Sequence, residues 1–185
     1  MRTGQHPIQR LVTCLAITLV SFAVAGCNAN KEAVEFNDKL VKLRQHVDGP
    51  EDEFLSRLDR LAAATDQKTE TIAALIRLLD AIRTTRDKLE EIPVLPSREA
   101  RDLHTAIREY YVGLEKVYNE EVRDSIETMS AADTDNARAA RVRNARRFIV
   151  AGYDRLNLVV ELAQKRYFEA NGMDWNRPRD STEAR

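Results

Sequence analysis

The chain contains only two cysteines, Cys14 and Cys27, and both lie near its N-terminus. The rest of the sequence therefore has neither a disulfide nor a cysteine metal site. Histidine is almost as scarce, and neither His46 nor His104 belongs to the Glu-x-x-His motif that carboxylate-bridged di-iron bundles use. The motifs of phosphate-binding loops and serine hydrolases are also absent. We therefore expect no metal site, no cofactor and no enzyme active site.

Glycine and proline are also few, with 6 and 5 residues, and the alternation of apolar and polar residues that marks strands is absent. These absences predict an all-α chain. Gly49 followed by Pro50 is typical of one helix ending and the next beginning. Pro93 to Ser97 forms a second break, with Ser97 as an N-cap. Together with breaks at 130–135 and at Asn171-Gly172, this predicts helices over 31–48, 51–92, 97–130 and 136–170.

Within these ranges the apolar residues recur at alternating steps of three and four, which is typical of left-handed bundle packing. We therefore predict an elongated antiparallel helical bundle of three long helices and a shorter first helix. A break within 64–69 is the alternative for the long helix 51–92. We prefer one helix, because the apolar phase passes from Leu61 through Lys68 to Ile72.

The N-terminus has the organisation of an export signal. Arg2 and Arg10 precede an uncharged, mostly apolar run from Leu11 to Ala25. An uncleaved membrane anchor is the alternative, but a spanning helix needs about 20 apolar residues and this run is shorter.

Val24-Ala25-Gly26-Cys27 resembles the lipobox of bacterial lipoproteins. The resemblance implies cleavage before Cys27 and attachment of a diacylglycerol to its sulfur, often with a further acyl chain on the new amino group. Two or more acyl chains anchor a protein stably to a membrane. Asn28 is not the aspartate associated with inner-membrane retention, so the resemblance favours the periplasmic side of the outer membrane, if the host has one.

These features divide the chain into four parts. They are a signal peptide over 1–26, a short tether over 27–30, the helical bundle over 31–172 and a tail over 173–185. The tail contains Trp175 but has no helical period, so we expect it to be disordered.

The charges are nearly balanced. Removal of the signal peptide takes away two of the 29 basic residues and leaves 27 against 30 acidic ones, a net charge of −3. This balance argues against a nucleic-acid-binding protein.

Five arginines lie within residues 137–147, where there is no acidic residue. They are either a patch for an anionic partner or a set of ordinary ion pairs with acidic residues of the preceding helix. In an antiparallel hairpin, residues at equal distances from the turn lie opposite each other. For the hairpin of these two helices, this places Glu127 opposite Arg138, Asp124 opposite Arg141 and Glu120 opposite Arg146. Arg143 and Arg147 remain without a partner, so we expect them to face another molecule.

Two charged residues occupy positions where the apolar pattern expects core residues. Lys68 and Glu121 should lie at one level if the helices 51–92 and 97–130 turn near residue 94. We therefore predict a partly buried Lys68–Glu121 ion pair. It would be a site for protons or ligand, or a device that fixes the register of the helices, and we favour the second interpretation.

Three tyrosines, Tyr110, Tyr111 and Tyr118, recur at helical spacing. They form either a stacking platform for a ligand or the edge of the core, and we favour the core. The whole pattern predicts a lipid-anchored envelope protein with a non-catalytic structural or interaction module. Its partner would be an envelope protein or a cell-wall polymer, and self-association stays open. The alternative is a bundle that carries a hydrophobic ligand or haem, with an enzyme as the third hypothesis.

Overall fold

The computed structural model describes residues 30–63, 65–130 and 132–174, and all regular structure within these ranges is helical. The prediction of an all-α chain is therefore confirmed. A helical segment over 30–43 passes through a turn at Arg44 into α2 (Gln45–Leu61). A 3₁₀ turn, η1 (Thr65–Gln67), then leads into α3 (Lys68–Glu90). The remaining elements are α4 (Arg98–Lys116), the π-helical segment η2 (Val117–Val122), α5 (Arg123–Glu127) and α6 (Asp135–Ala170).

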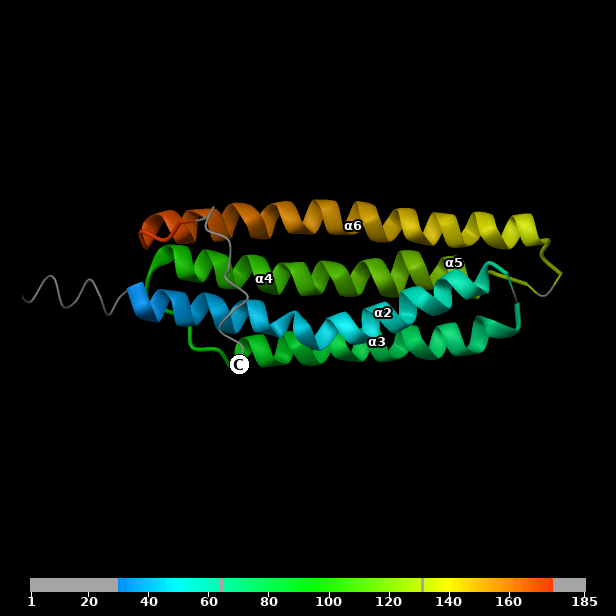
Figure 1. Ribbon diagram of the computed structural model, residues 1–185, viewed down its shortest axis with the longest axis horizontal. Helices are drawn as coiled ribbons and strands as arrows, with labels where there is room; N and C mark the ends of the chain where they lie inside the picture. Colours follow the sequence, from blue (N-terminus) through cyan, green and yellow to red (C-terminus); the bar gives the residue numbers. More distant parts are fainter. Residues whose placement is uncertain (1–29, 64, 131, 175–185) are drawn as a thin grey trace, which may run out of the picture.

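These elements form four rods that lie side by side along the long axis of the molecule (Figure 1). We call residues 30–61 the first rod and residues 98–127 the third rod, and α3 and α6 are the second and fourth. The beginning of the first rod, the connection from α3 to α4 and the end of α6 lie at one end of the molecule (Figure 1). The end of α2, the beginning of α3, the end of α5 and the beginning of α6 lie at the other end (Figure 1).

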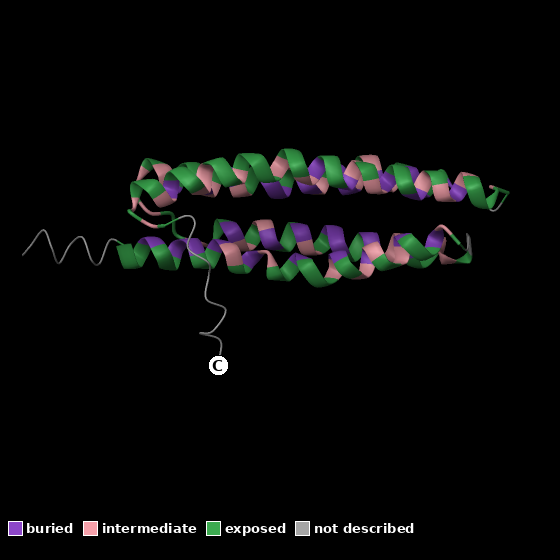
Figure 2. Ribbon diagram, turned by 45° about the horizontal axis from the view of Figure 1, so that its top comes forward, coloured by how far each residue is buried: buried purple, intermediate pink, exposed green. Residues whose placement is uncertain are grey.

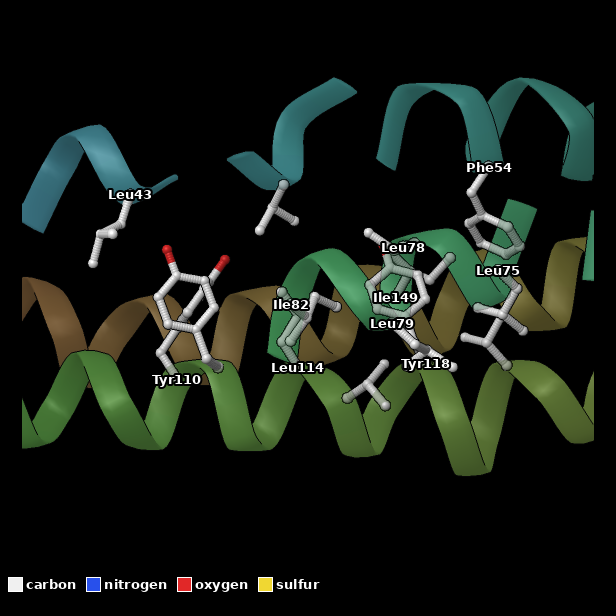
Figure 3. Packing of buried hydrophobic residues seen from close by; sticks show 14 of the residues in the cluster. Leu43, Phe54, Leu75, Leu78, Leu79, Ile82, Tyr110, Leu114, Tyr118 and Ile149 are labelled. Atoms are coloured by element: carbon white, nitrogen blue, oxygen red, sulfur yellow. The ribbon is translucent and has the colours of Figure 1, made fainter. Parts of the chain in front are cut away.

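The rods bury the faces that they turn toward one another (Figure 2). α2 packs mainly against α3, and α4 packs mainly against α6. Leucines and isoleucines of α3 meet Phe54 from α2, Tyr118 from η2 and Ile149 from α6 in a common interior (Figure 3). None of the helices within the described ranges is both long enough and apolar enough to cross a membrane.

Three predicted helix boundaries are confirmed. The hydroxyl of Ser97 accepts a hydrogen bond of 3.1 Å from the backbone N–H of Ala100, as an N-cap does. Thr134 caps α6 in the same way. Gly172 has a φ of 63° directly after α6, which is the left-handed conformation that ends many helices.

The predicted helix end at Gly49 is wrong, because α2 continues through Gly49 and Pro50. Proline lacks the N–H for a helical hydrogen bond and crowds the preceding turn. The buried positions on either side of Pro50 nevertheless keep one phase, from Val47 through Glu51 to Phe54. Burial of this continuous face outweighs the lost hydrogen bond, and the irregularity appears instead as the turn at Arg44.

The prediction of one continuous helix over 51–92 is also wrong. The chain breaks between Leu61 and Lys68 and turns back, which pairs α2 with α3. A single helix of this length would extend for about 63 Å. Folding back gives four rods of more similar length, and each can bury its apolar face along most of that length.

The pattern of threes and fours predicts Lys68, Ile72, Leu75, Leu79, Ile82, Arg86 and Leu89 on the buried face of α3, and the structure buries four of these seven: Leu75, Leu79, Ile82 and Leu89. Thr71 and Thr85 are buried, whereas Lys68, Ile72 and Arg86 are only partly buried. The threonine hydroxyls donate to backbone carbonyls of the preceding turn, at 2.7 Å in both cases. Because these hydroxyls satisfy their hydrogen bonds within the helix, threonine is tolerated in the interior.

Candidate functional site

A carboxylate lies in the interior between three of the rods. Glu51 of α2 is 6% exposed and occupies a core position of the first rod. Its Oε1 accepts a 2.6 Å hydrogen bond from the hydroxyl of Tyr118 and a second hydrogen bond from the hydroxyl of Tyr153. Its Oε2 lies 2.5 Å from Nη2 of Arg44. The carboxylate therefore links the first rod to η2 and to α6.

Arg44 lies at the turn between the segment 30–43 and α2, which directs its side chain toward the third and fourth rods. Its Nε donates to Asp48 at 2.8 Å, and its Nη1 donates to the Tyr110 hydroxyl at 2.9 Å. Its guanidinium also lies over the ring of Tyr153, 5.3 Å from the ring centroid. We call Arg44, Glu51, Tyr110, Tyr118 and Tyr153 the polar cluster.

The surroundings of Arg44 and of the three tyrosines favour the ordinary protonation states of these side chains. Burial raises the pKa of Tyr110, Tyr118 and Tyr153. Burial by itself would lower the pKa of Arg44, but the neighbouring oxygen atoms of Tyr110, Tyr153 and Glu51 outweigh it, and the pKa is raised. Around neutral pH the tyrosines are protonated and Arg44 is charged. These four side chains are therefore suited to holding the rods together.

A cavity of about 380 Å³ opens beside the polar cluster. It lies between the segment 30–44, α4 and the second half of α6. Its lining is mostly apolar or aromatic, and Arg44 is the one charged residue in it. The lining residues are Asn37, Leu40, Val41, Arg44, Ile107, Tyr110, Tyr111, Tyr153, Asn157, Val160 and Gln164.

Several neutral polar groups face this cavity. Asn37 is 4% exposed, and its Oδ1 accepts a 2.7 Å hydrogen bond from Nε2 of Gln164. This bond leaves the Asn37 amide N–H groups and the Gln164 carbonyl oxygen without a partner among the described residues. Tyr111 is 2% exposed, and its hydroxyl likewise has no hydrogen-bond partner in the described part of the chain. The cavity thus offers both donors and acceptors.

A second cavity, of about 300 Å³, lies between α4 and α6. It differs from the first in its charged lining, to which Asp102, Glu109 and Arg166 belong. No buried polar cluster adjoins it, so the first cavity is the stronger candidate site.

The predicted Lys68–Glu121 ion pair does not form. Nζ of Lys68 instead donates to the backbone carbonyls of Glu127 and Met129, at 2.7 and 2.6 Å. The break before Lys68 changes the register of α3, so that Lys68 meets the end of the third rod rather than Glu121. Carbonyl groups at the end of a helix have no partner within the helix, and a cation stabilises them there.

The arginines of the basic segment 137–147 form ion pairs with other partners than those predicted. Arg138 pairs with Asp135 within α6, Arg141 with Asp133, and Arg146 with Asp59 of α2 at 2.6 Å. The three predicted pairings with residues 120–127 are therefore wrong. Arg143 and Arg147 are exposed, and neither has an ion pair with any described residue.

The other expected site residues are placed as follows. Tyr118 is fully buried, while Tyr110 and Tyr111 combine core packing with a place in the cavity wall. Nε2 of His104 lies 3.1 Å from the carbonyl of Leu89, and Nε2 of His46 lies 3.3 Å from Nζ of Lys88. No group of acidic, histidine or cysteine side chains within the described ranges is arranged to hold a metal ion. Cys27 lies outside the described residues.

The sequence interpretation missed Arg44, Glu51 and Tyr153. A signal for Glu51 exists, because Glu51 continues the core phase from Val47 to Phe54. The apparent helix stop at Gly49-Pro50 concealed it. Arg44 and Tyr153 are 109 residues apart and have no local signal that connects them.

In comparisons with known proteins, no family model, no curated protein and no solved structure matches this chain.

Proposed function

We propose that this chain is a lipid-anchored protein of the cell envelope whose elongated antiparallel bundle is a non-catalytic structural or interaction module. The observation that supports an interaction role is a group of exposed apolar side chains on α6. Val150 and Leu158 of this helix are 58% and 57% exposed. Half of the exposed large apolar side chains in the described part of the chain lie on α6: Val150, Leu158, Val159 and Leu162. Leu158, Val159 and Leu162 lie within about one helical turn of one another, and contiguous exposed apolar groups are typical of an interaction surface.

The partner under this proposal is a second envelope protein that packs against α6. Arg143 and Arg147 lie on the same helix, exposed and without ion pairs among the described residues. They would add contacts to acidic groups of the partner, or to an acidic cell-wall polymer. A second copy of this chain is the simplest such partner.

The interaction can be tested with a photo-crosslinking amino acid at position 158 of α6, in living cells. The control carries the same group at Ile76 of α3, which is 45% exposed. We expect one discrete crosslinked product from position 158 and none from position 76. Equal products from both positions would show that the surface of α6 has no special role.

The anchor is proposed from the lipobox resemblance at Val24 to Cys27. Cys27 lies three residues before the first described residue, Asn30, and a tether of this length spans about 10 Å at most. The end of the molecule where the first rod begins and α6 ends would therefore lie close to the membrane. On the same resemblance we propose the periplasmic side of an outer membrane.

Fatty-acid labelling in cells tests the anchor. Cys27→Ser should abolish the label, because the acceptor sulfur is removed. Cys14→Ser makes the same exchange in the segment before the cleavage site and should retain the label. An unlabelled natural protein, or equal label in both variants, would contradict the anchor.

Binding of a hydrophobic ligand is the second candidate function, and the cavity beside the polar cluster favours it. Its volume of about 380 Å³ lies within the range of ligand pockets, and its lining is predominantly apolar. Haem does not fit, because the linings of both described cavities lack histidine, cysteine and methionine. The raised pKa values of the cavity's tyrosines also disfavour a phenolate ligand to iron.

A further inference from the structure

The charges around the cavity beside the polar cluster are already compensated within the protein. Arg44 is the one charged residue of the lining, and its guanidinium is bonded to Glu51 and Asp48. An anionic ligand would have to displace one of these carboxylates. A cationic ligand would meet Arg44 and no carboxylate in the lining. Either charge would therefore lose its hydration without gaining a counter-ion.

Two neutral groups of the lining have no hydrogen-bond partner within the described part of the chain. The Tyr111 hydroxyl and the Asn37 amide belong to side chains that are at least nine-tenths buried. Neither the hydroxyl nor the amide N–H groups have a partner in the described part of the chain. Neither atom is sealed from the cavity, so water occupies these positions in the empty protein and a bound molecule with a donor and an acceptor can replace it.

The rest of the wall sets the shape of the ligand. Leu40 and Val41 of the first rod, Ile107 of α4 and Val160 of α6 provide aliphatic surface. Tyr110 and Tyr153 add aromatic rings, whose centroids lie 6.4 Å apart. Flat aromatic rings pack well against such a wall.

We propose that this cavity binds a neutral, mostly apolar molecule of about two aromatic rings, whose single polar group is hydrogen-bonded by Tyr111 and Asn37. This inference rests on the second candidate function. It goes beyond that function because it assigns the charge of the ligand, its ring character and the residues that recognise its polar group.

Two fluorescent probes that differ in one charged group can test the charge. N-phenyl-1-naphthylamine is neutral, and 1-anilinonaphthalene-8-sulfonate carries the same rings with a sulfonate. Each is titrated into the full-length protein in lipid nanodiscs, and the signal of empty nanodiscs is subtracted. We expect saturable binding of the neutral probe and none of the sulfonate.

Matched variants locate the binding. Val160→Phe fills the cavity and should weaken binding of the neutral probe at least tenfold. Val112→Phe makes the same exchange on the exposed surface of α4, where Val112 is 49% exposed, and should leave binding unchanged. Tyr111→Phe removes only the unpaired hydroxyl and should weaken binding by roughly 2- to 10-fold, the effect of one hydrogen bond. If Val160→Phe fails to fold, Tyr111→Phe decides.

The ring character is tested by competition between 1-naphthol and hexadecanol, which are both neutral alcohols. We expect 1-naphthol to displace the probe at the lower concentration, and displacement by hexadecanol alone would show that the site takes a lipid chain instead. Saturable binding of the sulfonate that Val160→Phe abolishes would overturn the neutral class while leaving a ligand site in place. Binding of neither probe, or binding that Val160→Phe and Tyr111→Phe leave unchanged, would refute the ligand-binding function as a whole.

Discussion

At the scale of single residues, the structure places one carboxylate at a core position of the bundle. Burial of Glu51 is unfavourable unless its charge is compensated and its oxygen atoms are hydrogen-bonded. Arg44 provides the charge, and Tyr118 and Tyr153 provide the hydroxyls. Because these partners come from the first, third and fourth rods, a slipped packing would leave the carboxylate without them. We therefore infer that Glu51 helps to specify the register of the rods.

Replacement of Glu51 by alanine should lower the free energy of unfolding by roughly 2–4 kcal/mol, because Arg44 loses its buried counter-ion and two buried hydroxyls lose their acceptor. The side chain of Arg44 is 34% exposed and keeps Asp48, which moderates the loss. Urea denaturation followed by circular dichroism measures the effect.

Glu53→Ala is the control for this change. Glu53 lies on the same helix and pairs with Arg57 and Arg77, but it is more exposed to solvent. Its replacement should have a much smaller effect. Equal losses for both variants would show that the buried cluster contributes no more than a surface ion pair.

At the scale of the helices, the third and fourth rods approach each other closely because each carries a glycine at the contact. A Cβ atom at Gly113 of α4 would lie 2.5 Å from Cδ2 of Leu156, and one at Gly152 of α6 would lie 2.8 Å from Cγ2 of Val117. The π-helical segment η2 serves the same contact. Residues 114, 118, 122 and 126 are all buried at steps of four, and each such step overshoots an α-helical turn. The wider turn of η2 reduces this rotation.

The two glycines should respond differently to alanine. Gly113→Ala should be close to neutral, because the end of the Leu156 side chain is able to rotate away and alanine favours the helix by about 1 kcal/mol. Gly152→Ala should lower stability by about 1–2 kcal/mol, because Val117 is β-branched and is restricted at χ1. Thermal unfolding of both variants measures the difference.

The double variant Gly152→Ala/Val117→Ala distinguishes the cause of that loss. If the clash with Val117 is responsible, the effects of the two substitutions will not add, because Val117→Ala removes the methyl groups that the new Cβ atom at position 152 would meet. Additive effects would contradict the proposed contact.

At the scale of the whole molecule, all five tyrosines of the chain lie in the four-rod assembly, and burial raises the pKa of every one. For Tyr167 the pKa is raised to about 12. Its hydroxyl donates a 2.9 Å hydrogen bond to the carbonyl of Ala33, which joins the end of α6 to the beginning of the first rod. The tyrosines therefore report on the packing of the complete assembly.

Stability should fall as the pH rises above about 10, the pKa of an exposed tyrosine. Below this pH the hydroxyls are protonated in both the folded and the unfolded chain. Above it the unfolded chain loses protons while the folded chain retains them, so the unfolded state gains stability. We expect tyrosinate absorbance to appear together with the loss of helical circular dichroism. Tyrosinate absorbance with a midpoint near pH 10 in a chain that stays helical would contradict the buried positions.

The sequence alone determined the helical character of the chain and several of its helix ends. The step of three and four residues, the caps at Ser97 and Gly172 and the proline-rich connection before α4 depend only on neighbouring residues, so they can be recognised locally. Several buried apolar positions of the first rod, among them Ala33, Leu43 and Leu61, follow the same step.

Tertiary structure alone decided where the chain turns back and which polar groups meet. Gly49-Pro50 looks like a stronger helix stop than residues 62–67, yet α2 passes through the first and the chain turns at the second. Apolar periodicity does not show which of these two segments forms the turn. The free energy gained when α2 packs against α3 depends on the lengths and buried faces of both helices. The same turn moves Lys68 away from Glu121 and onto the end of the third rod. Tyr153 joins Arg44 and Glu51 for the same reason: its contacts with them exist only once rods distant in the sequence pack side by side.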